Sequence, residues 1–151
     1  MASKVEAEVE VKSPADNVWG AIRDSTALFP KIFPEQYKSI DIVEGDGKSA
    51  GTIRLLKFAE GAPVVTFAKE RIEVADDGNK LVSYSVIDGE LASFYKPFKA
   101  TLQVVPKSDG GGFVKWCLAY DKVNEEVPQP DFLLGTAVKT FKDLDAYLLQ
   151  K

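Results

Sequence analysis

The side chains that could perform acid–base or metal chemistry are few in this chain, and they form no recognised catalytic pattern. The sequence has no histidine, which is the usual general base near neutral pH and the commonest zinc ligand. Without histidine no Ser-His or Cys-His nucleophile pair can form, so we expect Cys117 to be inert. The acidic pairs Asp76-Asp77 and Glu125-Glu126 lie at predicted turns, where solvated charge is the ordinary state. We therefore expect no metal site and no cofactor.

A glycine-rich stretch resembles a nucleotide-binding loop in composition but not in context. Gly45, Gly47 and Gly51 lie within Gly45-Asp46-Gly47-Lys48-Ser49-Ala50-Gly51. A Walker loop requires a further glycine where Ile42 stands, and a dinucleotide fingerprint requires a helix after the loop. Residues 52–58 instead have the composition of a strand. The loop is therefore interpreted as a glycine-rich hairpin connection.

The bulk composition is that of an ordinary globular protein. The 151 residues, 45% hydrophobic and 28% charged, fit one domain over residues 1–151. A net charge of −4 gives no electrostatic reason to expect binding to nucleic acid or to an anionic membrane. The single cysteine suits a reducing compartment, and the first residues lack the apolar core of a signal peptide, so we expect a cytoplasmic location. Nothing indicates an obligate oligomer, and we expect a monomer.

Periodic patterns predict seven strands and a long final helix. The strands are expected at about 4–12, 37–44, 52–59, 64–75, 80–88, 92–105 and 113–122, and their short connections favour antiparallel pairing. Ser13-Pro14-Ala15-Asp16 begins a short helix, and Leu28 to Phe33 indicates a second one. An apolar stripe from Leu134 to Leu148 predicts a helix from about 129 to 149. This order predicts an α+β domain, with a curved antiparallel sheet around the last helix.

Side-chain parity places many apolar and aromatic residues on the inner face of that sheet. Arg54 and Lys96 share this face, and a bulge near Ala68-Lys69 would turn Glu70 inward as well. Two interpretations stay open for these three residues. They have a functional role inside the sheet, or they are structural residues that are paired with an opposite charge or exposed at the rim. Each aromatic residue taken alone is ordinary core, but a curved sheet around one helix need not fill its interior. The inner face is therefore the candidate ligand site.

Several segments together resemble the birch-pollen-allergen (pathogenesis-related) superfamily of plants, and most closely its major latex protein branch. The resemblance runs from about Val5 to Leu149 and rests on the order and spacing of its motifs. These motifs are Ala27-Leu28-Phe29-Pro30-Lys31, Ile42-Val43-Glu44-Gly45-Asp46-Gly47 leading to Gly51-Thr52-Ile53-Arg54, Tyr84-Ser85-Val86-Ile87-Asp88-Gly89, Tyr95-Lys96-Pro97-Phe98-Lys99 and Val114-Lys115-Trp116.

The resemblance implies a helix-grip fold, with a seven-stranded antiparallel sheet around a long C-terminal helix and two short helices between strands 1 and 2. It also implies a large cavity for apolar or amphipathic plant metabolites such as sterols, flavonoids, fatty acids and hormones, and an association with defence or stress responses. Val82 replaces a frequent tyrosine, and Trp116 and Leu118 replace smaller or polar groups, which indicates a narrower and more apolar cavity. The family's lining positions correspond to Phe29, Arg54, Leu56, Phe58, Phe67, Glu70, Val82, Tyr84, Ala100, Leu102, Trp116, Leu118, Tyr120, Leu134, Val138 and Phe141, and the predicted elements add Leu28 and Phe98.

Three functions are compatible with these observations. The first is non-catalytic binding and transport of a hydrophobic small molecule. The second is an enzyme of specialised metabolism, for which Glu70 is the weak candidate acid–base group and Lys96 its electrostatic partner. Relatives that catalyse alkaloid condensations or isomerisations exist, but their catalytic set has no match here residue by residue. The third is a regulatory protein that binds a protein partner when its ligand is present.

Overall fold

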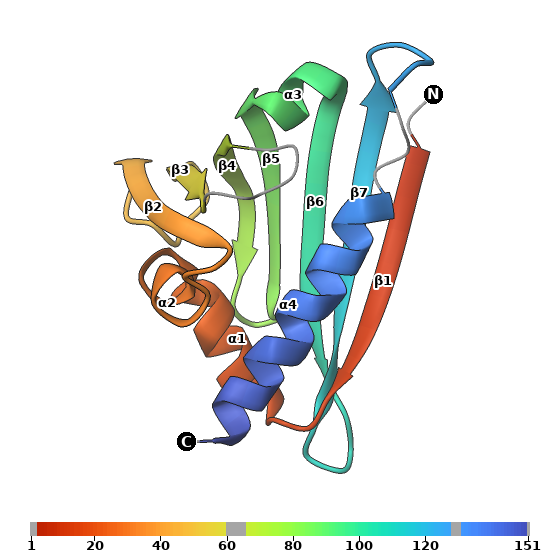
Figure 1. Ribbon diagram of the computed structural model, residues 1–151. Helices are drawn as coiled ribbons and strands as arrows, with labels where there is room; N and C mark the ends of the chain where they lie inside the picture. Colours follow the sequence, from red (N-terminus) through yellow and green to blue (C-terminus); the bar gives the residue numbers. More distant parts are fainter. Residues whose placement is uncertain (1–2, 60–65, 128–130, 151) are drawn as a thin grey trace.

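A curved antiparallel sheet wraps around the C-terminal helix in the computed structural model, which describes residues 3–59, 66–127 and 131–150 (Figure 1). The strands within these ranges form one seven-stranded sheet in the order β1-β7-β6-β5-β4-β3-β2, as the helix-grip expectation requires. The elements are β1 (Ser3–Val11), α1 (Ala15–Arg23), α2 (Ser25–Ile32), β2 (Tyr37–Glu44), β3 (Ile53–Phe58), β4 (Phe67–Asp76), β5 (Leu81–Gly89), α3 (Glu90–Phe94), β6 (Tyr95–Pro106), β7 (Gly112–Lys122) and α4 (Asp131–Leu149).

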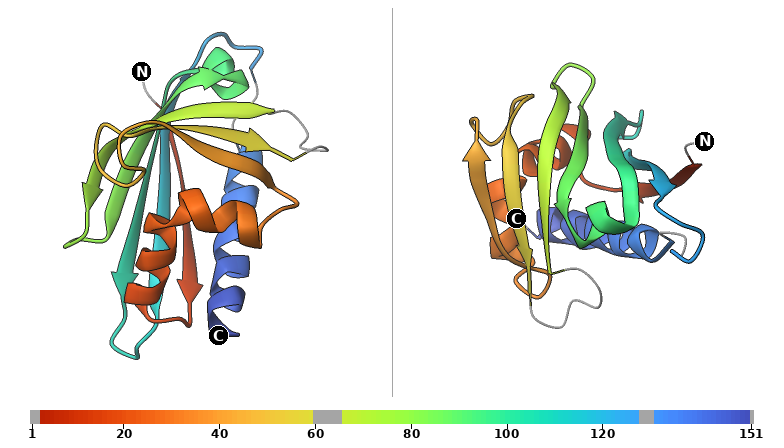
Figure 2. Two further views of the ribbon diagram at one scale, coloured as in Figure 1. Left: turned by 90° about the vertical axis from the view of Figure 1, so that its left-hand side faces the viewer. Right: turned by 90° about the horizontal axis from the view of Figure 1, so that it is seen from above.

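The helices cover the concave side of the sheet. Figure 1 shows α4 crossing this side diagonally, and Figure 2 shows α1 and α2 toward one end of the long strands and α3 at the opposite end. The first two residues of the strand expected at 64–75 and the expected helix start at about residue 129 lie outside the described residues. Within the described ranges, no helix is both long enough and apolar enough to span a bilayer.

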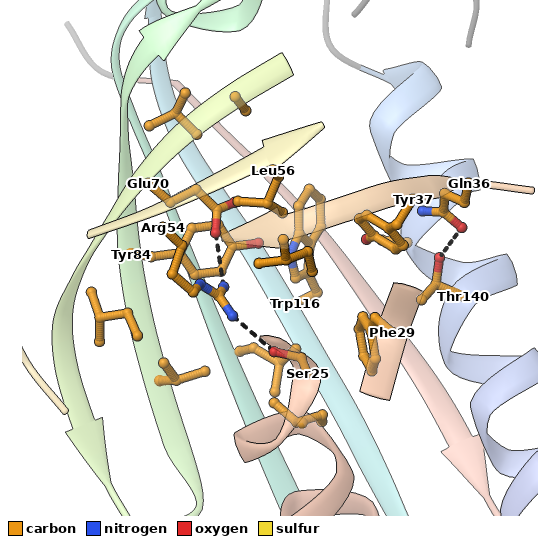
Figure 3. Close-up of a pocket in the computed structure, with 18 of the residues that line it drawn as sticks. Ser25, Phe29, Gln36, Tyr37, Arg54, Leu56, Glu70, Tyr84, Trp116 and Thr140 are labelled. Carbon is orange, nitrogen blue, oxygen red and sulfur yellow. Dashed lines mark hydrogen bonds and ion pairs between the residues drawn. The ribbon is translucent and has the colours of Figure 1, made fainter. Parts of the chain in front are cut away.

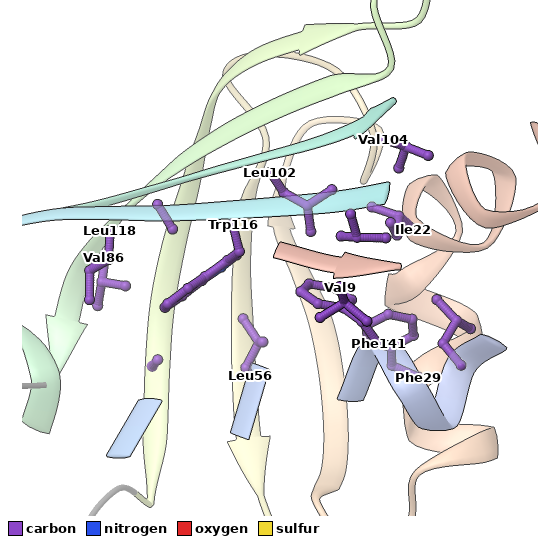
Figure 4. Close-up of a cluster of buried hydrophobic side chains, with 14 of the residues drawn as sticks. Val9, Ile22, Phe29, Leu56, Val86, Leu102, Val104, Trp116, Leu118 and Phe141 are labelled. Carbon is purple, nitrogen blue, oxygen red and sulfur yellow. The ribbon is translucent and has the colours of Figure 1, made fainter. Parts of the chain in front are cut away.

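The core lies between the concave face of the sheet and the helices (Figure 4). Ala100, Val114 and Leu118 are fully buried there, and Leu144 of α4 packs against the same cluster with 1% exposure. β1 pairs with β7 over the whole length of β1, from Ser3 with Tyr120 to Val11 with Gly112, and its Val9 and Val11 are buried. This part of the sheet is filled by side chains, because its apolar residues interdigitate with the helix.

Two contacts join the helices to distant parts of the chain. The Asp145 carboxylate of α4 accepts hydrogen bonds from the backbone N–H groups of Lys12 and Ser13, at 3.0 and 2.9 Å. Further along the same α1 region, Asp77 accepts from Trp19 Nε1 at 3.0 Å and lies 3.0 Å from Arg23 Nε. The first contact holds the C-terminal half of α4 against the β1–α1 turn, and the second holds α1 against the β4–β5 hairpin.

The strand register turns Glu70 inward, as predicted, although the bulge lies elsewhere. Ala68, Glu70 and Ile72 all face the interior, and Phe67 lies opposite Lys57 on the other parity. The pairing of β4 with β5 shifts between Lys69 and Glu70 and again between Ile72 and Val74. The first shift leaves an extra residue on β5 rather than on β4, because Lys69 pairs with Asp88 and Glu70 with Val86. The bulge expected at Ala68-Lys69 is therefore displaced.

The prediction that Lys96 faces inward is wrong. The register of β6 against β7 shifts between Tyr95 and Phe98, so Tyr95 and Phe98 are both buried while Lys96 and Pro97 are exposed. Residues 90–94 form the short helix α3 instead of the beginning of a strand. The even parity of the buried positions fails only at residues 94–97 and is confirmed from Phe98 onward, where Ala100, Leu102 and Val104 are buried.

Candidate ligand cavity

A cavity of about 210 Å³ lies between the concave face of the sheet, α1, α2 and α4. Its lining is mostly apolar, with a few polar groups from β3, β4, β5 and the helices (Figure 3). The volume is below the roughly 300–1,000 Å³ that is typical of sites for drug-sized ligands. We therefore expect a molecule of about two rings to fit the cavity better than a sterol.

One wall of the cavity is a row of aromatic rings. Phe29 of α2 packs edge-on against Phe33 with ring centroids 5.3 Å apart, and its other neighbour is Tyr37 at 5.9 Å. Tyr37 in turn lies 5.8 Å from Phe58 of β3. Phe29, Tyr37 and Phe58 line the cavity. The ring planes of neighbouring residues are tilted by 40° and 38°, so the rings form an uneven apolar wall against which a ring of a ligand can pack.

Two oppositely charged side chains lie directly opposite each other on neighbouring strands in the interior. Arg54 of β3 pairs in register with Glu70 of β4, and Arg54 Nη2 lies 2.8 Å from Glu70 Oε1. Arg54 Nη1 donates to Ser25 Oγ at 2.9 Å and to Thr26 Oγ1 at 3.3 Å. Arg54 and Glu70 are 9% and 7% exposed. The pair therefore satisfies the requirement that a buried charge has a counter-charge and hydrogen bonds.

Burial is the main cause of the shifted pKa values of the groups around this ion pair. It raises the pKa of Glu70, and the Arg54 guanidinium offsets part of the rise. Burial and the nearby Glu70 charge raise the pKa of Tyr37 and of Tyr84, so both tyrosines are neutral phenols at physiological pH. Trp116 also donates a hydrogen bond to the Tyr84 hydroxyl. The interior thus offers neutral hydroxyl groups beside a compensated ion pair.

A second polar group lies at the other end of the cavity, between α4 and the start of β2. Thr140 Oγ1 is 3.3 Å from Gln36 Oε1 and donates to the Thr136 carbonyl oxygen at 2.8 Å. Gln36 hydrogen-bonds Tyr37 in turn. Polar groups therefore stand at both ends of an apolar chamber, which is the arrangement that orients an amphipathic ligand.

The glycine-rich loop joins β2 to β3 as a hairpin connection, as the sequence predicts. Two of its backbone N–H groups are not open to a phosphate, because the Asp46 carboxylate accepts from the N–H groups of Lys48 and Ser49 at 2.8 and 2.7 Å. Gly45, Gly47 and Gly51 have φ angles of 89°, 88° and 91°, a region that favours glycine. Of the three, only Gly47 contributes to the cavity lining.

Replacing Asp46 by Asn is expected to lower the melting temperature near neutral pH. The N–H groups of Ser49 and Lys48 hold the pKa of Asp46 well below its ordinary value. A lowered pKa stabilises the folded state above the unfolded-state pKa of about 3.9, and this contribution is lost as the pH falls through the folded-state pKa. Thermal unfolding of both proteins across this range should show the difference shrinking below about pH 4. Asp41→Asn, at an exposed position of β2, is the matched control, and an equal effect there would contradict the prediction.

Of the predicted ligand-binding and glycine-loop residues, the structure places twelve in the cavity lining and nine outside it, and Gly45 and Gly51 are among the nine. Leu28, Leu134 and Val138 pack against the core beside the cavity, Ala100, Leu118 and Tyr120 are buried within the core, and Phe67 lies on the opposite parity of β4. Those in the lining are Phe29, Gly47, Arg54, Leu56, Phe58, Glu70, Val82, Tyr84, Phe98, Leu102, Trp116 and Phe141.

The structure also adds lining residues that the sequence analysis missed. Gln36 and Tyr37 precede or begin a strand, where parity gives no direction. On α4 the lining face contains Thr136, Ala137 and Thr140 next to Phe141. These small and polar residues lie beside the apolar stripe, and that stripe marks the packed side of the helix rather than the hollow side. The i, i+4 spacing of the two threonines is the signal that could have indicated this face.

The chain matches known proteins over nearly its whole length. The sequence profile of the pathogenesis-related protein Bet v 1 family matches residues 1–151. MLP-like protein 423 from Arabidopsis thaliana is 48% identical over 144 residues, which cover 95% of this chain and 92% of that protein.

Two solved structures share the fold at lower sequence identity. The crystal structure of ginseng major latex-like protein 151 from Panax ginseng has a TM-score of 0.88 at 24% identity and covers 97% of both chains. A norcoclaurine synthase point mutant from Thalictrum, solved with a transition-state analogue, has a TM-score of 0.82 at 22% identity and covers 99% of this chain and 96% of that one. The fold is thus one that encloses a cavity suited to hydrophobic ligands. The chain belongs to the pathogenesis-related Bet v 1 family, in its major latex protein branch.

Proposed function

We propose that the protein binds and carries a hydrophobic or amphipathic small plant molecule in its interior cavity, without chemical conversion. The observation that carries this proposal is the apolar chamber of about 210 Å³, which has polar groups at each end. Burial of the ligand's apolar surface, at about 25 cal/mol per Å², supplies the driving force, and the cost of association leaves a dissociation constant on the order of 1 µM. In this proposal the protein acts as a cytoplasmic monomer in defence or stress responses, and its partner is the small molecule.

The proposal is tested by closing the cavity from α4. Ala137 lines the chamber, and a tryptophan at this position would fill the space that a ligand occupies. We expect Ala137→Trp to weaken binding at least about tenfold across a calorimetric panel of flavonoids, sterols, fatty acids and hormones. Two-ring members of the panel should bind the unmodified protein more tightly than sterols.

The matched control is Ala146→Trp, on the exposed side of the same helix. It adds the same side chain without entering the cavity and should leave binding unchanged. Circular dichroism of both variants establishes that the helix is intact. Equal binding by Ala137→Trp and the unmodified protein would place the ligand elsewhere, and millimolar binding of the whole panel would end the proposal.

Catalysis in the same cavity is the second candidate, and the specific observation in its favour is Glu70. Burial raises the pKa of this carboxyl. A raised pKa brings a carboxyl closer to neutral pH, where a general acid or base works best. Lys96 cannot act as its partner, because its side chain is exposed on β6. If the protein is an enzyme, Glu70→Gln should abolish turnover and spare substrate binding. Unchanged turnover in that variant would remove Glu70 from any catalytic role.

A further inference from the structure

Each charged side chain that lines the cavity has a counter-charge within the protein. Within the described part of the chain, the charged lining residues are Arg23, Lys48, Arg54 and Glu70. Arg23 and Lys48 lie at the rim, with exposed side chains that pair with Asp77 and Asp24, both at 3.0 Å. Only Arg54 and Glu70 are buried, and they neutralise each other at 2.8 Å.

The hydrogen-bonding capacity of this pair is also largely used within the protein. Both terminal nitrogens of Arg54 donate to protein oxygens, on Glu70, Ser25 and Thr26. The Arg54 Nε atom has no partner among the described residues, but it is enclosed by protein atoms and so is closed to a ligand. A ligand therefore meets a compensated dipole beside the neutral hydroxyl groups of Tyr37 and Tyr84.

A charged ligand would disturb this balance. A carboxylate would bring a second negative charge next to Glu70, and an amine or amidine would bring a second positive charge next to Arg54. In each case one buried charge is left without a counter-charge, which is costly in an apolar interior. An uncharged ligand leaves the pair intact and can hydrogen-bond with the tyrosine hydroxyl groups.

We infer that the Arg54–Glu70 pair determines specificity and makes the cavity selective for uncharged compounds. Their class is an apolar framework of about two rings that carries a hydroxyl, carbonyl or amide group. Carboxylates and cations of the same shape are rejected. This inference rests on the proposed function, since it concerns the ligand of the same cavity.

Three ligands of nearly identical shape test the inference. These are 2-naphthamide, which is neutral, 2-naphthoate, which is an anion, and 2-naphthamidine, which is a cation near neutral pH. Calorimetric titration of the unmodified protein should show 2-naphthamide binding at least about tenfold more tightly than either charged ligand. Equal or tighter binding of 2-naphthoate or 2-naphthamidine would overturn the inference.

Variants of the pair should change this order in opposite directions. Glu70→Gln leaves Arg54 uncompensated, so 2-naphthoate should become the tightest ligand. Arg54→Gln leaves Glu70 uncompensated, so 2-naphthamidine should become the tightest. If the pair served only to stabilise the fold, both variants would bind all three ligands more weakly, without a change in their order. Such a result would also overturn the inference. If neither variant folds, the order measured for the unmodified protein decides the question.

The matched controls lie on the same strand as Glu70. Arg71 and Glu73 of β4 form an ion pair at 2.6 Å outside the cavity. Arg71→Gln and Glu73→Gln remove the same charges as the cavity variants and should keep the preference for 2-naphthamide. Binding by the flavonoid and sterol panel without binding of any naphthalene ligand would overturn the inference and leave the proposed function standing. If neither the flavonoid and sterol panel nor the naphthalene ligands bind, both the inference and the proposed function are contradicted.

Discussion

Replacing Arg54 alone by Met is expected to lower the free energy of unfolding by about 3–5 kcal/mol, because it leaves the Glu70 carboxylate buried without a counter-charge. Glu70 is 7% exposed, so water replaces little of the lost interaction. Urea unfolding near neutral pH measures the effect. Burial already raises the pKa of Glu70, and loss of the guanidinium removes the opposing influence. The instability should therefore be smallest below the unfolded-state pKa of about 4.3 and grow as the pH rises through the folded-state pKa.

The double variant Arg54→Met with Glu70→Leu is the matched control for this experiment. It removes both charges and replaces them with apolar side chains of similar length, a change that is often neutral or stabilising. We expect its free energy of unfolding to lie close to that of the unmodified protein. A double variant as unstable as Arg54→Met would show that packing, rather than the uncompensated charge, causes the loss.

Replacing Trp116 by Ala is expected to cost about 3–5 kcal/mol of stability and to widen the range of ligands. Trp116 of β7 is 7% exposed and lines the cavity beside Tyr84. Removal of the indole enlarges the chamber, so the affinity for sterols should rise relative to that for 2-naphthamide. Urea unfolding gives the stability, and calorimetry with the two ligands gives the affinity ratio.

Leu118→Ala is the control that distinguishes an effect on stability from an effect on ligand preference. Leu118 lies two residues further along β7, is fully buried and does not line the cavity. Its truncation should cost about 2–5 kcal/mol without changing the order of ligand affinities. The same affinity ratio in Trp116→Ala and Leu118→Ala would contradict the assignment of Trp116 as a residue that limits ligand size.

The element order could be predicted from the sequence because the strands alternate clearly and are separated by turn residues. The predicted strand 80–88 corresponds to β5 over Leu81–Gly89, and 113–122 to β7 over Gly112–Lys122. The short helix α3 was missed, because Glu90–Phe94 is only 5 residues long and its pattern continues into the following strand. A single turn of helix has too little periodicity to be distinguished from a strand start.

Site residues were predicted correctly where strand alternation sets the direction of the side chain, and they were missed where tertiary packing sets it. Parity alone placed Arg54 on the inner face, and Glu70 needed a bulge in addition. Their direct pairing depends on the register of β3 against β4, which parity does not specify. Lys96 shows the opposite case, since a local shift in β6 reverses its direction. Thr136 and Thr140 were missed because hydrophobicity identifies filled space, whereas a cavity can be lined by small polar side chains.

The pairing of β1 with β7 has a consequence for synthesis of the chain on the ribosome. The first strand ends at Val11, but the strand with which it pairs begins at Gly112. At about 5–20 residues per second, translation of the intervening segment takes roughly 5–20 s. During that interval the nascent N-terminus has an unpaired edge, and its alternation of Lys and Glu with small apolar residues keeps this edge charged. Such charges discourage aggregation between neighbouring nascent chains until the last strand emerges.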